Sequence, residues 1–152
     1  MRRRNLLQFA LASTPLSLLV TRAKAAQDSA APETRQADKV VYHLADLDKV
    51  GFVLGNIDNH YKGMGGADKV TIALVVHGPA LKAFHTADAS PDLTQHAGTL
   101  AKTGLELNAC INTMRAQNVT LNDLLPGFIV ADKGGVVRLA QLQAQGYVYL
   151  RP

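Results

Sequence analysis

The sequence predicts a three-layer α/β domain in which helices cover both faces of a mainly parallel sheet. From residue 39 onward, short apolar segments of strand character alternate with segments whose apolar residues recur at helical spacing. Residues 70–76 form a continuously apolar run, which is typical of a central strand in a parallel sheet. Glycines and a capping serine stand where helices should end and begin. Together these observations predict five strands and the helices that connect them.

The elements follow one another in alternation along the chain. The predicted strands are short runs that are apolar or alternate in polarity, and they comprise residues 40–44, 70–76, 105–110, 128–130 and 147–150. The predicted helices have one apolar face, and they comprise residues 46–62, 91–103, 111–117 and 135–145. Single helical turns are expected at residues 81–84 and 121–125. This alternation favours a flavodoxin-like or related doubly wound layout, whose strand order the sequence does not give.

Local signals justify the helix boundaries. The glycine-rich run 63–66 ends the first helix, because glycine adopts the backbone conformations that stop a helix. Ser90 is a good N-cap for the second helix, and Gly104 ends it. The last helix should face the core with Val136, Leu139 and Leu142.

The first 25 residues have the features of a signal peptide in the expected order. Arginines at 2–4 precede a mostly apolar, uncharged stretch at 5–21, and an A-x-A cleavage site follows at 23–25. The Arg3–Arg4 pair also resembles the twin-arginine signal, so the twin-arginine and general secretion routes both remain open. We expect cleavage after residue 25 and a periplasmic mature protein.

Two further segments complete the expected organisation. Residues 26–38 are rich in Ala, Gln, Asp and Pro and should form a disordered leader, and residues 39–152 should form the α/β domain. Five of the 16 basic residues precede the cleavage site, which leaves 11 basic against 12 acidic residues in the mature chain. The apparent basic character therefore belongs to the targeting segment, and it gives no electrostatic case for nucleic-acid binding.

The candidate site lies where strands end, since parallel α/β sheets bind ligands outside the carboxyl ends of their strands. Cys110, the single cysteine, ends a predicted strand and immediately precedes a predicted helix. A helix N-terminus favours a thiolate over a thiol, and backbone N–H groups from Asn112 onward point toward such a position. The alternative is a small buried hydrophobe. His43 and His77 also end strands, either as a general base or as histidines bonded to a backbone carbonyl.

Other motifs give weaker signals. His60, His85 and His96 are expected at the surface, and no two histidines have zinc-site spacing, so we expect no metal. The glycines at 134–135 precede a helix, but no phosphate-binding motif accompanies them, and nucleotide binding is a weak interpretation.

The chain resembles the DsrE/DsrF-like family. The resemblance rests on segments spread along the chain at residues 70–78, 110–115, 124–127, 135–143 and 146–152. It implies a flavodoxin-like parallel α/β fold and homo-oligomers, commonly trimers or hexamers. Some members are subunits of sulfur-relay complexes in which one cysteine, placed after a central strand and at the start of a helix, carries a persulfide. Cys110 matches that position.

Three functions follow as hypotheses. In the first, Cys110 is a sulfurtransferase-type sulfur carrier and His77 is its neighbour, while the residues that stabilise the bound sulfur are Asn112, Thr113, His43 and Gly78. Its donor and acceptor would be proteins or small sulfur compounds, with no cofactor and no membrane contact after cleavage. The second is a non-catalytic module that binds a small ligand or another subunit, with a structural cysteine. The third, flavin-dependent electron transfer, lacks a phosphate loop.

Overall fold

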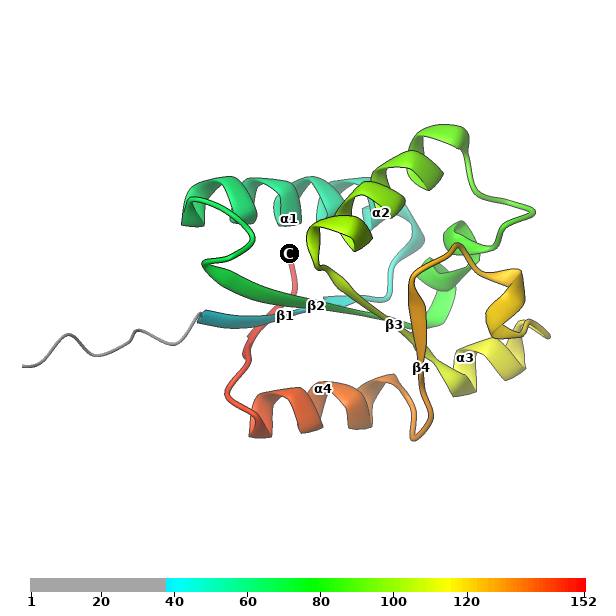
Figure 1. Ribbon diagram of the computed structural model, residues 1–152. Helices are drawn as coiled ribbons and strands as arrows, with labels where there is room; N and C mark the ends of the chain where they lie inside the picture. Colours follow the sequence, from blue (N-terminus) through cyan, green and yellow to red (C-terminus); the bar gives the residue numbers. More distant parts are fainter. Residues whose placement is uncertain (1–37) are drawn as a thin grey trace, which may run out of the picture. The chain divides into compact units, whose positions relative to one another are not determined.

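The structure is a computed structural model that describes residues 38–152 (Figure 1). The expected signal peptide, residues 1–25, and residues 26–37 of the expected leader lie outside the described residues. Asp38, which was expected to end the leader, instead begins the first strand, because it continues the pairing of that strand with its neighbour. The strands are β1 (Asp38–Leu44), β2 (Val70–Val76), β3 (Glu106–Cys110), β4 (Phe128–Ala131) and β5 (Val148–Leu150). The helices are α1 (Val50–Met64), α2 (Pro91–Thr103), α3 (Ile111–Ala116) and α4 (Gly135–Ala144), with 3₁₀ helices η1 (Leu47–Lys49), η2 (Gly78–Phe84) and η3 (Leu121–Asp123).

The five strands form one parallel sheet in the order β4-β3-β2-β1-β5. β2 is the central strand, as its continuous apolar sequence predicts. Strands β1 to β4 extend the sheet in one direction, and α4 then carries the chain back to β5 on the other side of β1. The order of the strands therefore reverses at β1. The carboxyl ends of β1, β2 and β3 lie side by side near this reversal, where such folds bind ligands.

Helices cover the sheet on both faces, as expected. Figure 1 shows α1 and α2 on one face and α4 on the other. The α1/α2 side holds the larger core, which includes the fully buried side chains of Leu54, Ile57, Ile72, Leu74 and Phe84. Burying one such side chain contributes about 1.5–3 kcal/mol, so this larger core accounts for most of the hydrophobic stabilisation. The smaller core under α4 leaves room on that face for polar and reactive side chains.

The smaller core is formed by two leucines of α4 and three residues of the sheet. Leu139 and Leu142 pack on Val41, Ala73 and Val75, which belong to β1 and β2. The side chains of these strands alternate between faces, so His43 and His77 lie on the same side as Val41 and Val75. In β3 the residues on this side are Glu106, Asn108 and Cys110.

The helix boundaries agree with the prediction apart from a small shift at the end of the first helix, and one predicted core position is wrong. Ser90 caps α2, because its Oγ accepts a hydrogen bond from the N–H of Leu93 at 3.2 Å. The first helix begins with η1 and continues to Met64, since Gly65, with φ of 88°, is the residue that turns left-handed. Val136 does not face the core: it is 71% exposed, because Gly135 takes the inward position in that turn of α4. Within residues 38–152, no helix is both long and apolar enough to cross a bilayer.

Candidate functional site

The predicted strand-end residues meet on the α4 side of the sheet. Cys110 ends β3 and is the N-cap residue of α3. His77 follows β2, and its N–H donates to the carbonyl of Leu44 at 3.0 Å, so it continues the pairing of β1 and β2. Because β3 pairs with β2 and β2 with β1, the side chains of Cys110, His77 and His43 come from three adjacent strands.

Backbone N–H groups determine the electrostatics of the thiol. Cys110 is 6% exposed, and this burial raises the pKa of the thiol. The backbone N–H groups of Thr113, Gly135 and Asn112, together with the Thr113 hydroxyl, favour the thiolate form of the sulfur, and their effect on the pKa outweighs that of burial. The net result is a Cys110 pKa below its usual value. The donors belong to the first turns of both α3 and α4.

Gly135 brings the start of α4 against the thiol. A Cβ at this position would lie 3.2 Å from the Cβ of Cys110 and 3.3 Å from the Cβ of His77. A Cβ on Gly134, which has φ of 97°, would lie 2.8 Å from Nδ2 of Asn112. Two adjacent glycines are therefore needed for this approach. This role of the two glycines was not predicted from the sequence, although a glycine pair between a strand and a helix was the available signal.

Thr113 connects the thiol to the loop after β2. Its Oγ1 accepts a hydrogen bond from the N–H of Gly78 at 2.9 Å. The side chain of Gln117 donates to the carbonyl of Gly78 at 3.0 Å. Gly78 itself has φ of 59°, a conformation that suits glycine, and the Cβ of another residue there would lie 3.4 Å from the carbonyl oxygen of Ala45. These bonds fix α3 to the end of β2 and hold Thr113 beside the sulfur.

A chain of hydrogen bonds leads from His77 to the protein surface. The Nε2 atoms of His77 and His43 are hydrogen-bonded to each other, and Nδ1 of His43 is bonded to the hydroxyl of Tyr149 at 2.6 Å. The two imidazoles are stacked, with centroids 4.6 Å apart. Tyr149 is 38% exposed and belongs to β5, the strand beyond β1. No signal in the sequence connected Tyr149 with this site.

Both imidazoles are neutral at pH 7. Burial, then the neighbouring His77, then the Arg151 guanidinium lower the pKa of His43 to about 4, against an opposing effect of Asp46. Burial and Arg151 also lower the pKa of His77, and Asp46 again opposes them. The wall beside the thiol therefore consists of neutral imidazoles that are able to accept a proton.

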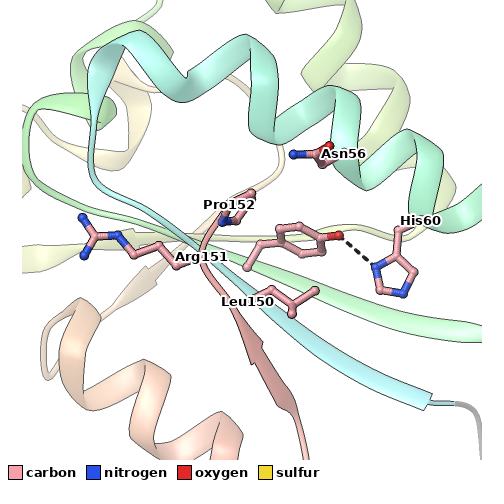
Figure 2. A pocket seen from close by; sticks show the side chains of 6 residues that line it. Asn56, His60, Leu150, Arg151 and Pro152 are labelled. Carbon is pink, nitrogen blue, oxygen red and sulfur yellow. Dashed lines mark hydrogen bonds between the residues drawn. The ribbon is translucent and has the colours of Figure 1, made fainter.

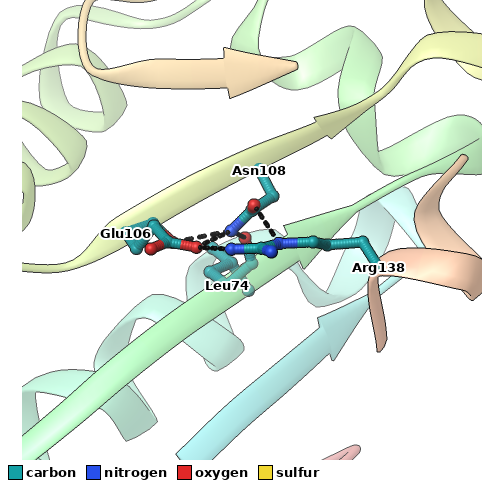
Figure 3. Close-up of polar contacts among 4 residues, drawn as sticks. All are labelled: Leu74, Glu106, Asn108 and Arg138. Atoms are coloured by element: carbon teal, nitrogen blue, oxygen red, sulfur yellow. Dashed lines mark hydrogen bonds and ion pairs between the residues drawn. The ribbon is translucent and has the colours of Figure 1, made fainter. Parts of the chain in front are cut away.

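Three polar side chains join α4 to β3 (Figure 3). Arg138 donates from Nε to Oδ1 of Asn108 at 2.9 Å and from Nη2 to Oε1 of Glu106 at 2.6 Å. Nδ2 of Asn108 donates to the same Glu106 oxygen at 3.0 Å. Asn108 is completely buried, so its amide depends on these partners. We call these three residues the Glu106–Asn108–Arg138 network.

A cavity lies on the opposite face of the sheet, beside α1 (Figure 2). Its volume is about 450 Å³, and it is lined by Tyr42, Asn56, His60, Leu150, Arg151 and Pro152. The hydroxyl of Tyr42 and Nδ1 of His60 are hydrogen-bonded at 2.9 Å. Apolar walls with a few polar groups are typical of small-molecule sites.

The remaining histidines are more enclosed than expected. His85 is the clearest case: its side chain is 12% exposed, because Nε2 is bonded to Oε1 of Gln117 at 2.8 Å. His96 is paired with Asp58 at 2.6 Å. Over residues 38–152, no three His, Cys, Asp or Glu side chains are placed to hold a metal ion.

Comparison with known proteins identifies relatives. The model of the DsrE/DsrF-like family matches residues 19–152. A protein of unknown function from Methanobacterium thermoautotrophicum, MTH1491, is 26% identical, with a TM-score of 0.66 over 76% of this chain and 99% of that chain. The ychN protein of E. coli is 12% identical, with a TM-score of 0.55 over 77% of this chain and 100% of that chain, and supports the fold alone. No curated protein matches the sequence.

Proposed function

Because the chain belongs to the DsrE/DsrF-like family, which is linked to sulfur relay, we propose that Cys110 carries sulfur as a persulfide. The observation that carries the proposal is the placement of one buried cysteine at the end of β3 and the start of α3, with the start of α4 packed against it. A persulfide is an anion whose charge lies on its outer sulfur. Backbone N–H groups at helix N-termini stabilise such an anion without adding a mobile cation.

The transfer is balanced without a redox partner. The thiolate of Cys110 attacks the sulfane sulfur of a donor such as thiosulfate. A sulfur–sulfur bond forms to Cys110, the sulfur–sulfur bond of the donor breaks, and sulfite leaves with the electron pair. An acceptor thiolate then attacks the outer sulfur of the persulfide and releases the Cys110 thiolate. The N–H donors of Asn112, Thr113 and Gly135 serve the anion on Cys110 in each state.

The neutral histidine pair gives the thiol proton a route out. His77 follows the strand next to that of Cys110, and we propose that it accepts the thiol proton. His43 and Tyr149 then pass a proton on toward solvent through their hydrogen bonds. A neutral imidazole suits this task, because a protonated one would already hold the proton that it needs to accept. The sequence suggested His77 as the neighbour of the thiol and His43 as a residue that stabilises the bound sulfur; His43 is proposed here instead as part of the proton route, together with Tyr149.

Sulfur uptake is the direct test. The purified protein is incubated with thiosulfate or polysulfide, and its intact mass is measured before and after treatment with a reductant. We expect a gain of one or more sulfur atoms that the reductant reverses and that Cys110→Ser abolishes. Because the sequence contains one cysteine, any thiol-bound sulfur is assigned without mapping. A Cys110 that neither gains sulfur nor reacts with iodoacetamide near neutral pH contradicts the proposal.

A second function, the binding of a small organic ligand, is favoured by the cavity beside Tyr42. In that case the cysteine is structural, and the cavity on the α1 face is the functional site. The sulfur-uptake experiment separates the two functions, since a ligand-binding module with a structural cysteine would have an unreactive thiol. Export to the periplasm and assembly into homo-oligomers remain part of the proposal for either function.

A further inference from the structure

The Glu106–Asn108–Arg138 network lies on the same face of the sheet as the thiol, further back along β3. Glu106, Asn108 and Cys110 are alternate residues of β3, so their side chains share the α4 face of the sheet. Arg138 follows Gly135 by three positions, which places both in the first turn of α4. The turn of α4 that supplies the Gly135 N–H is therefore bonded to the strand that supplies the sulfur.

Apolar packing alone does not fix this contact. Leu139 and Leu142 pack on residues of β1 and β2, whereas Cys110 belongs to β3. Hydrophobic contact is non-directional, so it holds α4 on the sheet without fixing the distance between Gly135 and β3. Arg138 donates directional hydrogen bonds to two side chains of β3, Asn108 and Glu106. These bonds fix the orientation of this turn relative to β3.

We propose that Arg138 is a positioning residue, and that through Glu106 and Asn108 it holds the start of α4 where the Gly135 N–H reaches the sulfur of Cys110. The inference rests on the proposed function only for the purpose of this contact, which is to stabilise an anionic sulfur on Cys110. The contact itself is defined by the geometry of β3 and α4. Arg138 does not touch the sulfur; it acts through the helix on which it lies.

The test measures the pH dependence of Cys110 alkylation by iodoacetamide in Arg138→Met and Glu106→Met. Each variant removes the hydrogen bond between Arg138 and Glu106 and replaces a charged side chain by an uncharged, unbranched one; Arg138→Met also removes the bond to Asn108. We expect both to shift the profile to higher pH, with the rate below the thiol pKa lowered about threefold and the high-pH plateau retained. Losing one N–H donor should lower the thiolate population about tenfold. A more basic thiolate is also more nucleophilic, and this partly offsets the loss, which leaves about threefold in rate.

The signs of the two shifts separate positioning from simple charge. Arg138→Met removes a positive charge and Glu106→Met a negative one, so a through-space charge effect shifts their profiles in opposite directions. Positioning predicts the same direction for both. His43, His77 and Tyr149, the titratable groups from the neighbouring strands, are unchanged in both variants. Opposite shifts, or no shift in folded protein, overturn the inference.

Controls keep the result clear. Arg115→Met removes an exposed arginine from α3 and should leave the profile as in wild type. Circular dichroism checks folding, and if Arg138→Met does not fold, the sign of the Glu106→Met shift decides alone. Alkylation does not require sulfur uptake. A wild-type protein that gains no sulfur therefore refutes the proposed function, while the alkylation profiles still judge the role of Arg138.

Discussion

Replacing Gly135 by alanine tests the contact between α4 and the thiol most directly. The new Cβ would lie 3.2 Å from the Cβ of Cys110 and 3.3 Å from that of His77, closer than ordinary van der Waals contact. The backbone at Gly135 is helical and has no positive φ, so conformational strain does not contribute. The methyl group must therefore push the first turn of α4 away from the sheet by a few tenths of an ångström.

Two magnitudes follow from this displacement. Overpacking costs about 1–3 kcal/mol, and the better helix propensity of alanine returns at most about 1 kcal/mol. We expect a net loss of about 1 kcal/mol in the free energy of unfolding. Weakening the Gly135 N–H bond to the thiolate should lower the thiolate population roughly threefold to tenfold. After correction for nucleophilicity, alkylation below the thiol pKa should slow about twofold to fourfold.

Urea unfolding and the pH profile of alkylation measure these effects on the same samples. Gly98→Ala is the matched control, because Gly98 lies inside α2 and a Cβ added there would have nothing within 4 Å. The control should gain about 0.5–1 kcal/mol in stability and leave alkylation unchanged. If Gly135→Ala is stabilised like the control and its thiol keeps the wild-type profile, the proximity of α4 to Cys110 is refuted.

Two further predictions concern stability. The pKa of His43 is about 4 when folded, below the ordinary value of 6.5, so the unfolded chain binds this proton first as the pH falls. Stability should therefore decrease from pH 6.5 to pH 4, and His43→Asn should flatten that decrease in urea unfolding. Cys110→Ser should be at least as stable as wild type, because a serine at this N-cap position bonds the first turn of α3. A loss of more than about 1 kcal/mol would instead indicate a cysteine kept for its packing.

Local signals in the sequence predict the elements of this fold well. The bounds of β2 and α2 follow from an unbroken apolar run and from a Ser90 cap, which are properties of a few neighbouring residues. The position of β5 beside β1 does not follow, because it depends on where α4 crosses the sheet. The prediction that Val136 faces the core was wrong for a related reason, because Gly135, which has no side chain, faces the core in its place.

The same distinction between local signals and long-range contacts applies to the residues of the site. Cys110 and His77 could be predicted, because both end strands and neighbouring strands bring their ends together. Gly135 could not, since it contributes a backbone N–H from a helix that begins 25 residues after the cysteine. Tyr149 depends on the strand order. The polar residues Glu106 and Asn108 on one face of a buried strand were a readable signal that a charged partner covers that face.

The capping of α3 explains what a cysteine gains at this position. Helix N-termini leave N–H groups without intrahelical partners, and an N-cap Ser, Thr, Asn or Asp satisfies one of them at a benefit of about 1 kcal/mol. Cys110 holds the N-cap position, yet its side chain forms no capping hydrogen bond, because a neutral thiol is a weak acceptor. The same N–H groups, joined by that of Gly135, become strong partners once the sulfur is an anion. The first turn of α3 thus gains a strong side-chain acceptor only when Cys110 is a thiolate or a persulfide, which is the state that a sulfur carrier needs to stabilise.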